Sequence, residues 1–179
     1  MRSFILFIAL LATAGPLKAD DINLFELFNY YEYSSNLASS GQPTREQLPA
    51  IAEAGVSAVI NLAPLTSPGA FADEGERFEA LGIEYIHIPV NWEQPPLTDL
   101  KTFLAAMDQF SDQRILVHCM ANARASLFVY LWRSLKAGDD DDEVHKTMVT
   151  IWANNEGYEL YNFKQWLAFI EEAKSEFIQ

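Results

Sequence analysis

The residues with the clearest chemical potential in this 179-residue chain are its only cysteine, Cys119, and Arg124, five positions later. A cysteine thiolate is a strong nucleophile, and a guanidinium presents a planar pair of donors to two oxygens of a tetrahedral oxyanion. The pair therefore predicts attack by a thiolate on an oxyanionic substrate. The alternative interpretation is a buried structural cysteine beside an unrelated arginine, because free cysteine is among the most buried residue types.

The position of Cys119 between two predicted elements favours the chemical interpretation. Residues 114–118 (RILVH) form a short apolar run typical of a buried strand, and a helical pattern covers residues 124–137. Ligands of open α/β sheets bind at the carboxyl ends of strands, and loop amides followed by a helix N-terminus favour anions. The same helix end and Arg124 favour the thiolate form of Cys119. We therefore expect an anion-binding loop made of Met120, Ala121, Asn122, Ala123 and Arg124.

The rest of the chain alternates between helical and strand patterns. Pro43 and Thr44 open a helix with a capping box to Gln47, and Gly55 ends it. Residues 20–36 fit neither pattern, and residues 37–41 indicate a short edge strand. Further strands are predicted at 56–62 and 83–90, and further helices at 71–81, 97–110, 140–153 and 158–174. Such alternation predicts a single α/β domain, with a largely parallel sheet and helices on both faces.

Composition excludes several classes of partner and cofactor. Twenty-five acidic against twelve basic residues give a net charge of −13, so we expect no binding to nucleic acid or to an anionic membrane surface. One cysteine excludes an internal disulfide and any multi-cysteine metal site. Residues 139–143 are five consecutive acids that predict a solvated helix cap. Because the three histidines lie on different elements, we expect no metal and no cofactor; they are His87, His118 and His145.

The first nineteen residues are predicted to be a signal peptide rather than part of the fold. Arg2 supplies a positive start, and residues 4–14 (FILFIALLATA) are an apolar run too short to span a bilayer. We expect cleavage after Ala19, with cleavage after Ala14 as the alternative. The mature domain would then comprise residues 20–179, exported to a bacterial periplasm, with no membrane anchor. We expect it to be a monomer.

Four short motifs give the chain a family resemblance: Ser40–Pro43 (SGQP), 59–62 (VINL), 88–90 (IPV) and His118-Cys119. The sequence resembles the cysteine-dependent tyrosine and dual-specificity phosphatases, in particular the bacterial phosphatase-like domains also found fused to β-lactamase-like hydrolases. This resemblance implies a cysteine-phosphatase fold and hydrolysis of a phosphomonoester through a phosphocysteine intermediate. The implied substrate is a small phosphoester or a protein carrying phosphotyrosine or phosphoserine.

The resemblance also implies roles for individual residues. Cys119 would be the nucleophile, and Arg124 would clamp the phosphoryl oxygens. The Ser126 hydroxyl would help the phosphocysteine leave, and His118 would orient the loop and stabilise the thiolate. The family places an acidic aspartate in the loop after the strand that ends here at Val90. No aspartate stands there, so Glu93 is the first candidate for the general acid and Asp99 the second.

The cysteine loop departs from the family pattern in length and in composition. The family has five residues between cysteine and arginine, whereas this chain has four and lacks the usual glycines. Asn122 is the only loop residue suited to a left-handed conformation. Four residues is also the spacing in rhodanese-type sulfurtransferases. Three functions stay open: a phosphatase, which leads, a non-catalytic module that binds an oxyanion or phosphopeptide, and a rhodanese-like sulfurtransferase.

Overall fold

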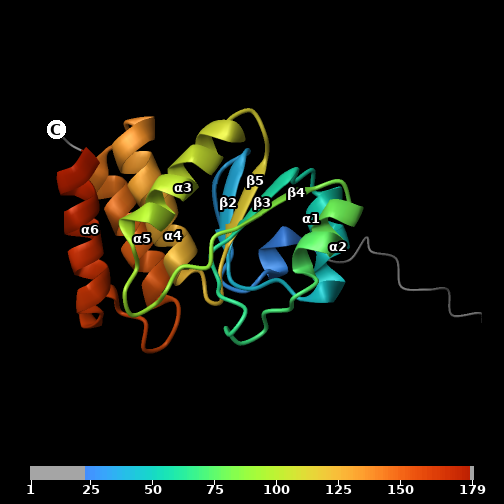
Figure 1. The fold of residues 1–179 in the computed structure, drawn as a ribbon, viewed down its shortest axis with the longest axis horizontal. Helices are drawn as coiled ribbons and strands as arrows, with labels where there is room; N and C mark the ends of the chain where they lie inside the picture. The colour runs from blue at the N-terminus through green and yellow to red at the C-terminus, as the bar shows by residue number, and fades with distance from the viewer. Residues whose placement is uncertain (1–22, 178–179) are drawn as a thin grey trace, which may run out of the picture.

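The computed structural model describes residues 23–177 and is organised around one twisted sheet (Figure 1). The strands lie in the order β1-β2-β5-β3-β4. All neighbours are parallel except β1 and β2, which pair antiparallel. The strands are β1 (Tyr31–Ser34), β2 (Leu37–Ser40), β3 (Ala58–Asn61), β4 (Glu84–His87) and β5 (Ile115–His118).

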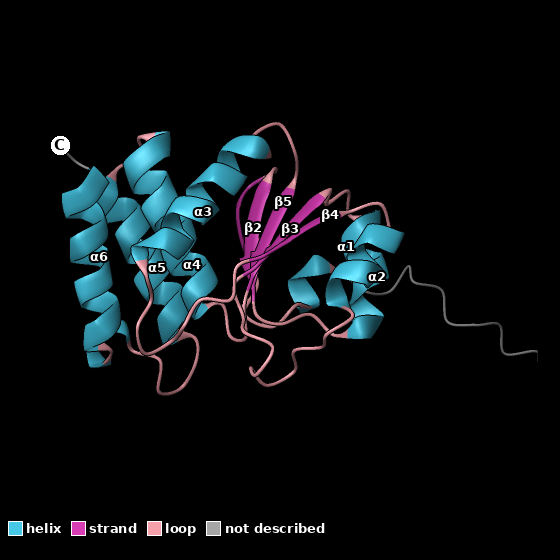
Figure 2. Ribbon diagram, in the orientation of Figure 1, coloured by secondary structure: helices cyan, strands magenta, loops and turns pink. Residues whose placement is uncertain are grey.

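Helices cover both faces of this sheet, as Figure 2 shows. On one side lie α1 (Leu48–Glu53) and α2 (Glu74–Ala80). On the other side lie α3 (Leu97–Gln109), α4 (Ala123–Trp132), α5 (Asp141–Ala153) and α6 (Lys164–Phe177). Short turns of 3-10 helix occur at Leu24–Glu26, Arg45–Gln47 and Leu160–Asn162, and a π-helical turn follows α4 at Arg133–Ala137. The predicted α/β architecture is therefore confirmed.

The sheet separates two apolar layers, and successive strand residues contribute to them in turn. In β5, Ile115 and Val117 pack into the larger layer with α3, α4, α5 and α6, whereas Leu116 packs into the smaller layer with α1 and α2. Because both faces of β5 are buried, its sequence is a continuous apolar run instead of an alternating one. The same burial explains the run in β3, where Ile60 and Val59 face opposite layers.

Local signals set several boundaries where the sequence predicted them. The Thr44 N–H donates to the Gln47 side-chain oxygen at 2.9 Å, which closes the predicted capping box. The segment that follows ends at Gly55, whose φ of +81° lies in the left-handed region open to glycine. Helix α3 matches its predicted range to within one residue at its C-terminal end. It begins directly after Pro96, because a proline disfavours the helical conformation for the residue that precedes it.

Two expectations about element placement were wrong. Residues 37–41 were expected to form an edge strand, but β2 pairs on both sides, and all four of its residues are buried. The edge belongs to β1, which is mostly exposed and bulged, so its sequence shows no regular alternation. Helix α6 begins at Lys164, not at 158. Tyr158 and Phe163 pack against Trp92 instead, and the segment between them forms a 3-10 turn and not a regular α-helix.

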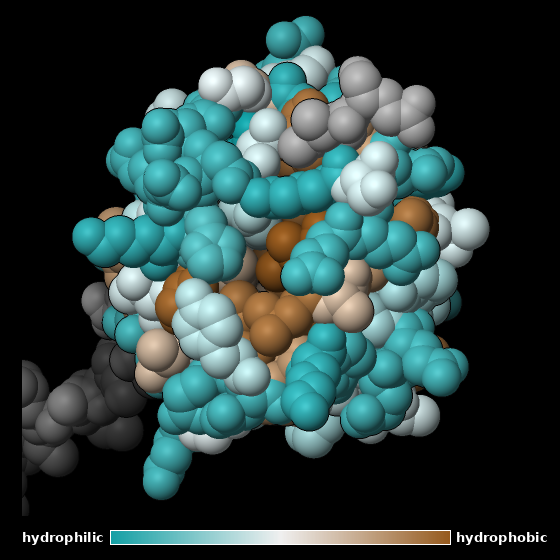
Figure 3. All heavy atoms as spheres, turned by 90° about the vertical axis from the view of Figure 1, so that its left-hand side faces the viewer, coloured by the Kyte–Doolittle hydropathy of each residue, from teal (hydrophilic) through white to brown (hydrophobic). Residues whose placement is uncertain are grey.

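The acidic run at residues 139–143 begins α5 as a cap, as predicted. The Asp140 carboxylate accepts the Glu143 N–H at 3.0 Å, and Asp141 contacts Lys174 of α6 at 2.6 Å. Figure 3 views the molecule from the side of α6 and shows mainly hydrophilic side chains around a narrower apolar strip. Within residues 23–177, no helix combines the length and apolar character needed to cross a bilayer. The predicted signal peptide, residues 1–19, lies outside the described residues.

Candidate active site

A pocket of about 260 Å³ opens where β5 runs into α4, and Cys119 and Arg124 both line it. This is the carboxyl end of the parallel strands, where α/β sheets bind ligands. The loop after β3 supplies the opposite wall, and aromatic side chains supply a further one. The lining residues are Thr66, Ser67, Pro68, Trp92, Cys119, Met120, Ala121, Ala123, Arg124 and Tyr158. The structure therefore brings together the predicted nucleophile and the predicted oxyanion clamp.

The backbone of the cysteine loop is anchored to the strand end beside it. The Cys119 N–H donates to the Ser40 carbonyl at 3.3 Å, and the Met120 carbonyl accepts the Gln42 N–H at 3.1 Å. Asn122 adopts a left-handed conformation with φ of +67° and begins α4, as its residue type predicted. Among residues 23–177, the N–H groups of Met120, Ala123 and Arg124 have no acceptor. Free donors at a helix N-terminus are suited to bind an anion.

Arg124 is held in the pocket wall by an aromatic ring instead of a carboxylate. The side chain is 8% exposed, and its guanidinium carbon lies 5.1 Å from the centre of the Trp92 ring. No carboxylate of the described residues forms an ion pair with it. A cation–π contact of this kind contributes about 0.5–2 kcal/mol, and the N–H donors in the plane of the guanidinium group stay usable. Its positive charge is therefore available to an anionic ligand.

Trp92 in turn is fixed by aromatic side chains from the segments around α5 and α6. Its ring lies 5.7 Å from Trp152 and 5.1 Å from Trp166, measured between ring centres. Tyr158 and Phe163 contact it edge-on at 5.7 and 5.2 Å. Trp92 therefore forms a rigid aromatic part of the pocket lining.

Ser126 lies one turn into α4 and does not line the pocket. Its hydroxyl is buried and donates to the Asn122 carbonyl at 2.6 Å, with the Ala123 carbonyl at 3.2 Å. In this geometry the hydroxyl supports the left-handed residue at the start of α4. The role inferred for it by resemblance, in release of the phosphocysteine, stays a prediction.

The two candidate general acids lie apart from the pocket. Glu93 is exposed, and its backbone N–H donates to the Asn91 side chain at 2.8 Å. Asp99 lies in the first turn of α3, and partial burial raises the pKa of its carboxyl. Neither side chain lines the pocket, and no other carboxylate in the described part of the chain does so. The structure therefore does not bring a carboxylate to Cys119.

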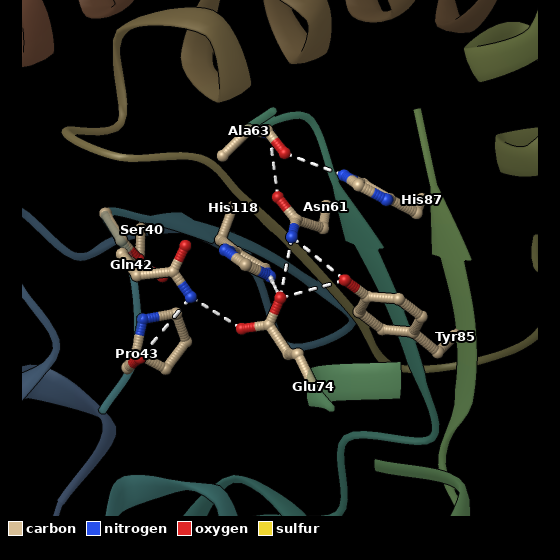
Figure 4. Close-up of polar contacts among 10 residues, drawn as sticks. Ser40, Gln42, Pro43, Asn61, Ala63, Glu74, Tyr85, His87 and His118 are labelled. Atoms are coloured by element: carbon tan, nitrogen blue, oxygen red, sulfur yellow. Dashed lines mark hydrogen bonds and ion pairs between the residues drawn. The ribbon is translucent and has the colours of Figure 1, made fainter. Parts of the chain in front are cut away.

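His118 is fully buried behind the pocket and faces a buried carboxylate, as Figure 4 shows. Its Nε2 atom lies 3.7 Å from the nearer carboxylate oxygen of Glu74. Burial lowers the pKa of His118, and the negative Glu74 opposes this effect without reversing it. The lowered pKa favours the neutral form of the imidazole. The role inferred for His118 by resemblance, in orienting the loop and stabilising the thiolate, stays a prediction.

Glu74 is the residue that sequence analysis missed, because a glutamate in a helix normally lies at the surface. Here it is 2% exposed and accepts hydrogen bonds from three neutral donors. These are Gln42 Nε2 at 2.5 Å, Asn61 Nδ2 at 2.6 Å and the Tyr85 hydroxyl at 2.8 Å (Figure 4). Burial and the nearby carboxylate raise the pKa of Tyr85, which keeps its hydroxyl protonated as a donor.

The same network reaches the loop that forms the opposite wall of the pocket. The Asn61 side-chain oxygen accepts the Ala63 N–H at 2.7 Å, and the His87 Nε2 atom lies 2.7 Å from the Ala63 carbonyl. Glu74 therefore connects the base of the cysteine loop, through His118, with the segment that leads to Thr66 and Ser67. The sequence patterns assigned neither Thr66 nor Ser67 to the site. Their position after a parallel strand was the signal that could have identified them.

Comparison with known proteins places this architecture in a family. Residues 27–164 match the family described as "DSP-PTPase phosphatase fused to NAD+ Kinase". A solved candidate phosphatase of the DUF442 group from Shewanella putrefaciens CN-32 is 36% identical, with a TM-score of 0.74. The match covers 84% of this chain and 92% of that one. No match was found among curated proteins.

More distant structures share the fold. TpbA of P. aeruginosa is 15% identical with a TM-score of 0.62, over 85% of this chain and 92% of that one. Tk-PTP is 17% identical with a TM-score of 0.64, over 82% of this chain and 97% of that one. The family match over most of the chain, the 36% identity and the cysteine loop at the end of β5 lead to one assignment. The chain belongs to the tyrosine and dual-specificity phosphatase-like family.

Proposed function

We propose that this protein hydrolyses phosphomonoesters with Cys119 as the nucleophile. The observation that carries the proposal is the shared pocket, in which Cys119 and Arg124 flank free backbone donors at the start of α4. A thiol, a guanidinium and free amides in one place are suited to a tetrahedral dianion. The phosphatase-like family assignment supports the same chemistry.

In the proposed reaction, the Cys119 thiolate attacks phosphorus, so that a sulfur–phosphorus bond forms as the ester phosphorus–oxygen bond breaks. The N–H groups of Met120, Ala123 and Arg124 and the Arg124 guanidinium hold the three phosphoryl oxygens as their charge is redistributed. Water then attacks phosphorus and regenerates the thiol with release of inorganic phosphate. The leaving oxygen carries away the electron pair of the broken bond and takes up one proton.

The source of that proton favours one class of leaving group. No carboxylate of residues 23–177 lines the pocket, so the leaving oxygen departs with little help from an acid. A phenol has a pKa of about 10, whereas an aliphatic hydroxyl is far less acidic, so a phenolate leaves much more easily. We therefore propose that aryl phosphates, including phosphotyrosine, are better substrates than alkyl phosphates such as phosphoserine.

The decisive experiment measures turnover of a small aryl phosphate by residues 20–179, with the Cys119→Ser variant as the control. Wild-type protein should release phosphate and accumulate one phosphoryl group on Cys119, detected by mass spectrometry after rapid acid quench. The variant should do neither. A parallel assay with thiosulfate and cyanide tests the sulfurtransferase alternative. If the wild type binds phosphate but gives no turnover, the proposal is wrong and the binding-module interpretation replaces it.

We further propose that the protein acts outside the cytoplasm as the mature chain 20–179. The apolar run at residues 4–14 and the small residue Ala19 before two aspartates support export. The acidic composition supports a soluble phosphoester or phosphoprotein as the partner, rather than nucleic acid.

A further inference from the structure

The Ala121 carbonyl of the cysteine loop accepts hydrogen bonds from two side-chain amides that are distant in sequence. Asn29 Nδ2 donates to it at 3.1 Å, and Asn155 Nδ2 donates to it at 3.0 Å. Asn29 precedes β1, and Asn155 follows α5. In return, the Asn122 side chain donates to the Asn29 carbonyl at 2.7 Å. We call Asn29, Asn122 and Asn155 the asparagine clasp.

Backbone conformation singles out two of the same residues. Asn29 and Asn122 have φ of +47° and +67°, and no other non-glycine residue in the described chain has a positive φ. A positive φ is uncommon outside glycine, and asparagine is one of the few residues that tolerate it. Here the two left-handed residues are joined directly by a hydrogen bond.

The donors in the clasp have a fixed orientation. Asn29 Nδ2 also donates to the Ile151 carbonyl at 3.0 Å, and its Oδ1 atom accepts from Asn154 Nδ2 at 3.2 Å. A flipped Asn29 amide would face two carbonyl oxygens with its own oxygen, so the hydrogen-bond network permits one orientation only. The Ala121 carbonyl is thereby offered an N–H from each asparagine.

The direction of that carbonyl matters for an anion in the pocket. The two amides that bind the Ala121 oxygen belong to residues outside the pocket lining, so we infer that this oxygen is directed away from the anion site. A peptide that rotated this oxygen into the pocket would place a partial negative charge against the anion. It would also release Asn122 from the conformation that begins α4, and so displace the Ala123 and Arg124 donors.

We propose that Asn29 and Asn155 are positioning residues that hold the cysteine loop in its anion-binding form; this inference rests on the function proposed above. The loop has four residues between Cys119 and Arg124 and contains no glycine. Its left-handed turn must therefore come from Asn122, with support from outside the loop. Asn29 and Asn155 supply that support from two separate parts of the chain.

Vanadate and phosphate affinity tests the clasp, because an oxyanion occupies the pocket whether or not turnover occurs. The Asn29→Gly variant removes the amide but tolerates the positive φ, and Asn155→Ala removes the second donor. We expect each to weaken oxyanion binding about threefold, because the carbonyl retains one partner. The double variant should lose about 30-fold, more than the product of the two, because the carbonyl then has none.

The matched control is Asn162→Ala, because Asn162 is exposed, donates to Glu159 and contacts neither the clasp nor the pocket lining. It should leave oxyanion affinity unchanged. Affinity is measured well below each variant's unfolding temperature, so a purely structural role would lower the melting temperature and leave the dissociation constant unchanged. If Asn29→Gly does not fold, Asn155→Ala answers the same question, because Asn155 carries no left-handed strain.

Three results would overturn the positioning role that we propose for the clasp. The first is wild-type affinity in the double variant, and the second is an equal loss of affinity in Asn162→Ala. Either would leave the proposed function standing, because the wild type binds the oxyanion. The third is a wild-type protein that binds neither phosphate nor vanadate, which overturns the proposed function and the clasp together.

Discussion

Replacing Arg124 by alanine tests the proposed oxyanion clamp most directly, because no other side-chain cation of residues 23–177 lines the pocket. Among the residues that line the pocket, Arg124 alone carries a positive charge. It is 8% exposed and free of a carboxylate partner within the described chain. We expect Arg124→Ala to weaken phosphate and vanadate binding strongly and to leave the fold intact.

The magnitude follows from the burial of the guanidinium. A hydrogen bond to a charged group contributes about 1.5–3 kcal/mol, and the low exposure of Arg124 places the contact in the upper part of this range. A loss of about 2–3 kcal/mol corresponds to about a 30- to 150-fold weaker affinity. Because Arg124 also contacts Trp92, some stability is lost as well, by about 0.5–2 kcal/mol.

The assay is isothermal titration with phosphate and competitive inhibition by vanadate, and Arg133→Ala is the matched control. Arg133 follows the same helix and also stacks over an aromatic ring, 5.5 Å from Tyr33, but it lies far from the pocket lining. The control should bind phosphate as the wild type does. Equal affinities in Arg124→Ala and wild type would show that Arg124 is not a clamp. A similar loss in Arg133→Ala would show that the effect is one of net charge.

Three further predictions concern stability and processing. Burial lowers the pKa of His118 below its ordinary value of 6.5. As the pH falls, the unfolded chain therefore takes up a proton at His118 before the folded chain does. The free energy of unfolding should consequently decrease below pH 6.5. Urea titrations above and below that pH should show less of this loss in His118→Asn than in the wild type. Glu74→Gln should cost about 2–4 kcal/mol in urea unfolding, because its amide cannot accept all three hydrogen bonds, whereas the exposed Glu76→Gln should cost under 0.5 kcal/mol. N-terminal sequencing of protein from the extracytoplasmic fraction should begin at Asp20; an intact first residue would refute export with cleavage.

The sequence predicted those parts of the molecule that depend on short-range patterns. Strand β5 is buried throughout and shows a continuous apolar run, whereas α3 buries one side and shows apolar residues at helical spacing. Both elements were therefore predicted nearly at their observed bounds. Cys119 was assigned to a strand end from these neighbours alone. Asn122 was selected for the left-handed position because its side chain tolerates a positive φ better than those around it.

What the sequence could not predict depends on contacts between distant segments. Glu74 has the pattern of a surface residue, and it becomes buried only because side chains from β3, β4 and β5 surround its carboxylate. Glu93 was predicted to be the general acid from its place in the loop after β4. Loops have no regular periodicity from which the direction of a side chain could be predicted, and the structure shows Glu93 exposed. Asn29 lies 92 positions from the Ala121 carbonyl that it contacts, so no local pattern could connect them.

The same long-range contacts explain how a shortened loop can still form an ordered site. Arg124 is positioned by Trp92, and Trp92 is positioned by Trp152 of α5 and Trp166 of α6. Those two helices supply no lining tryptophan or charge of their own to the pocket, yet they determine where its cation lies. Ser126 adds a contact from inside α4 to the Asn122 carbonyl. Order in this site is therefore imposed by the layer of helices packed behind the loop, and the loop itself needs no glycine to achieve it.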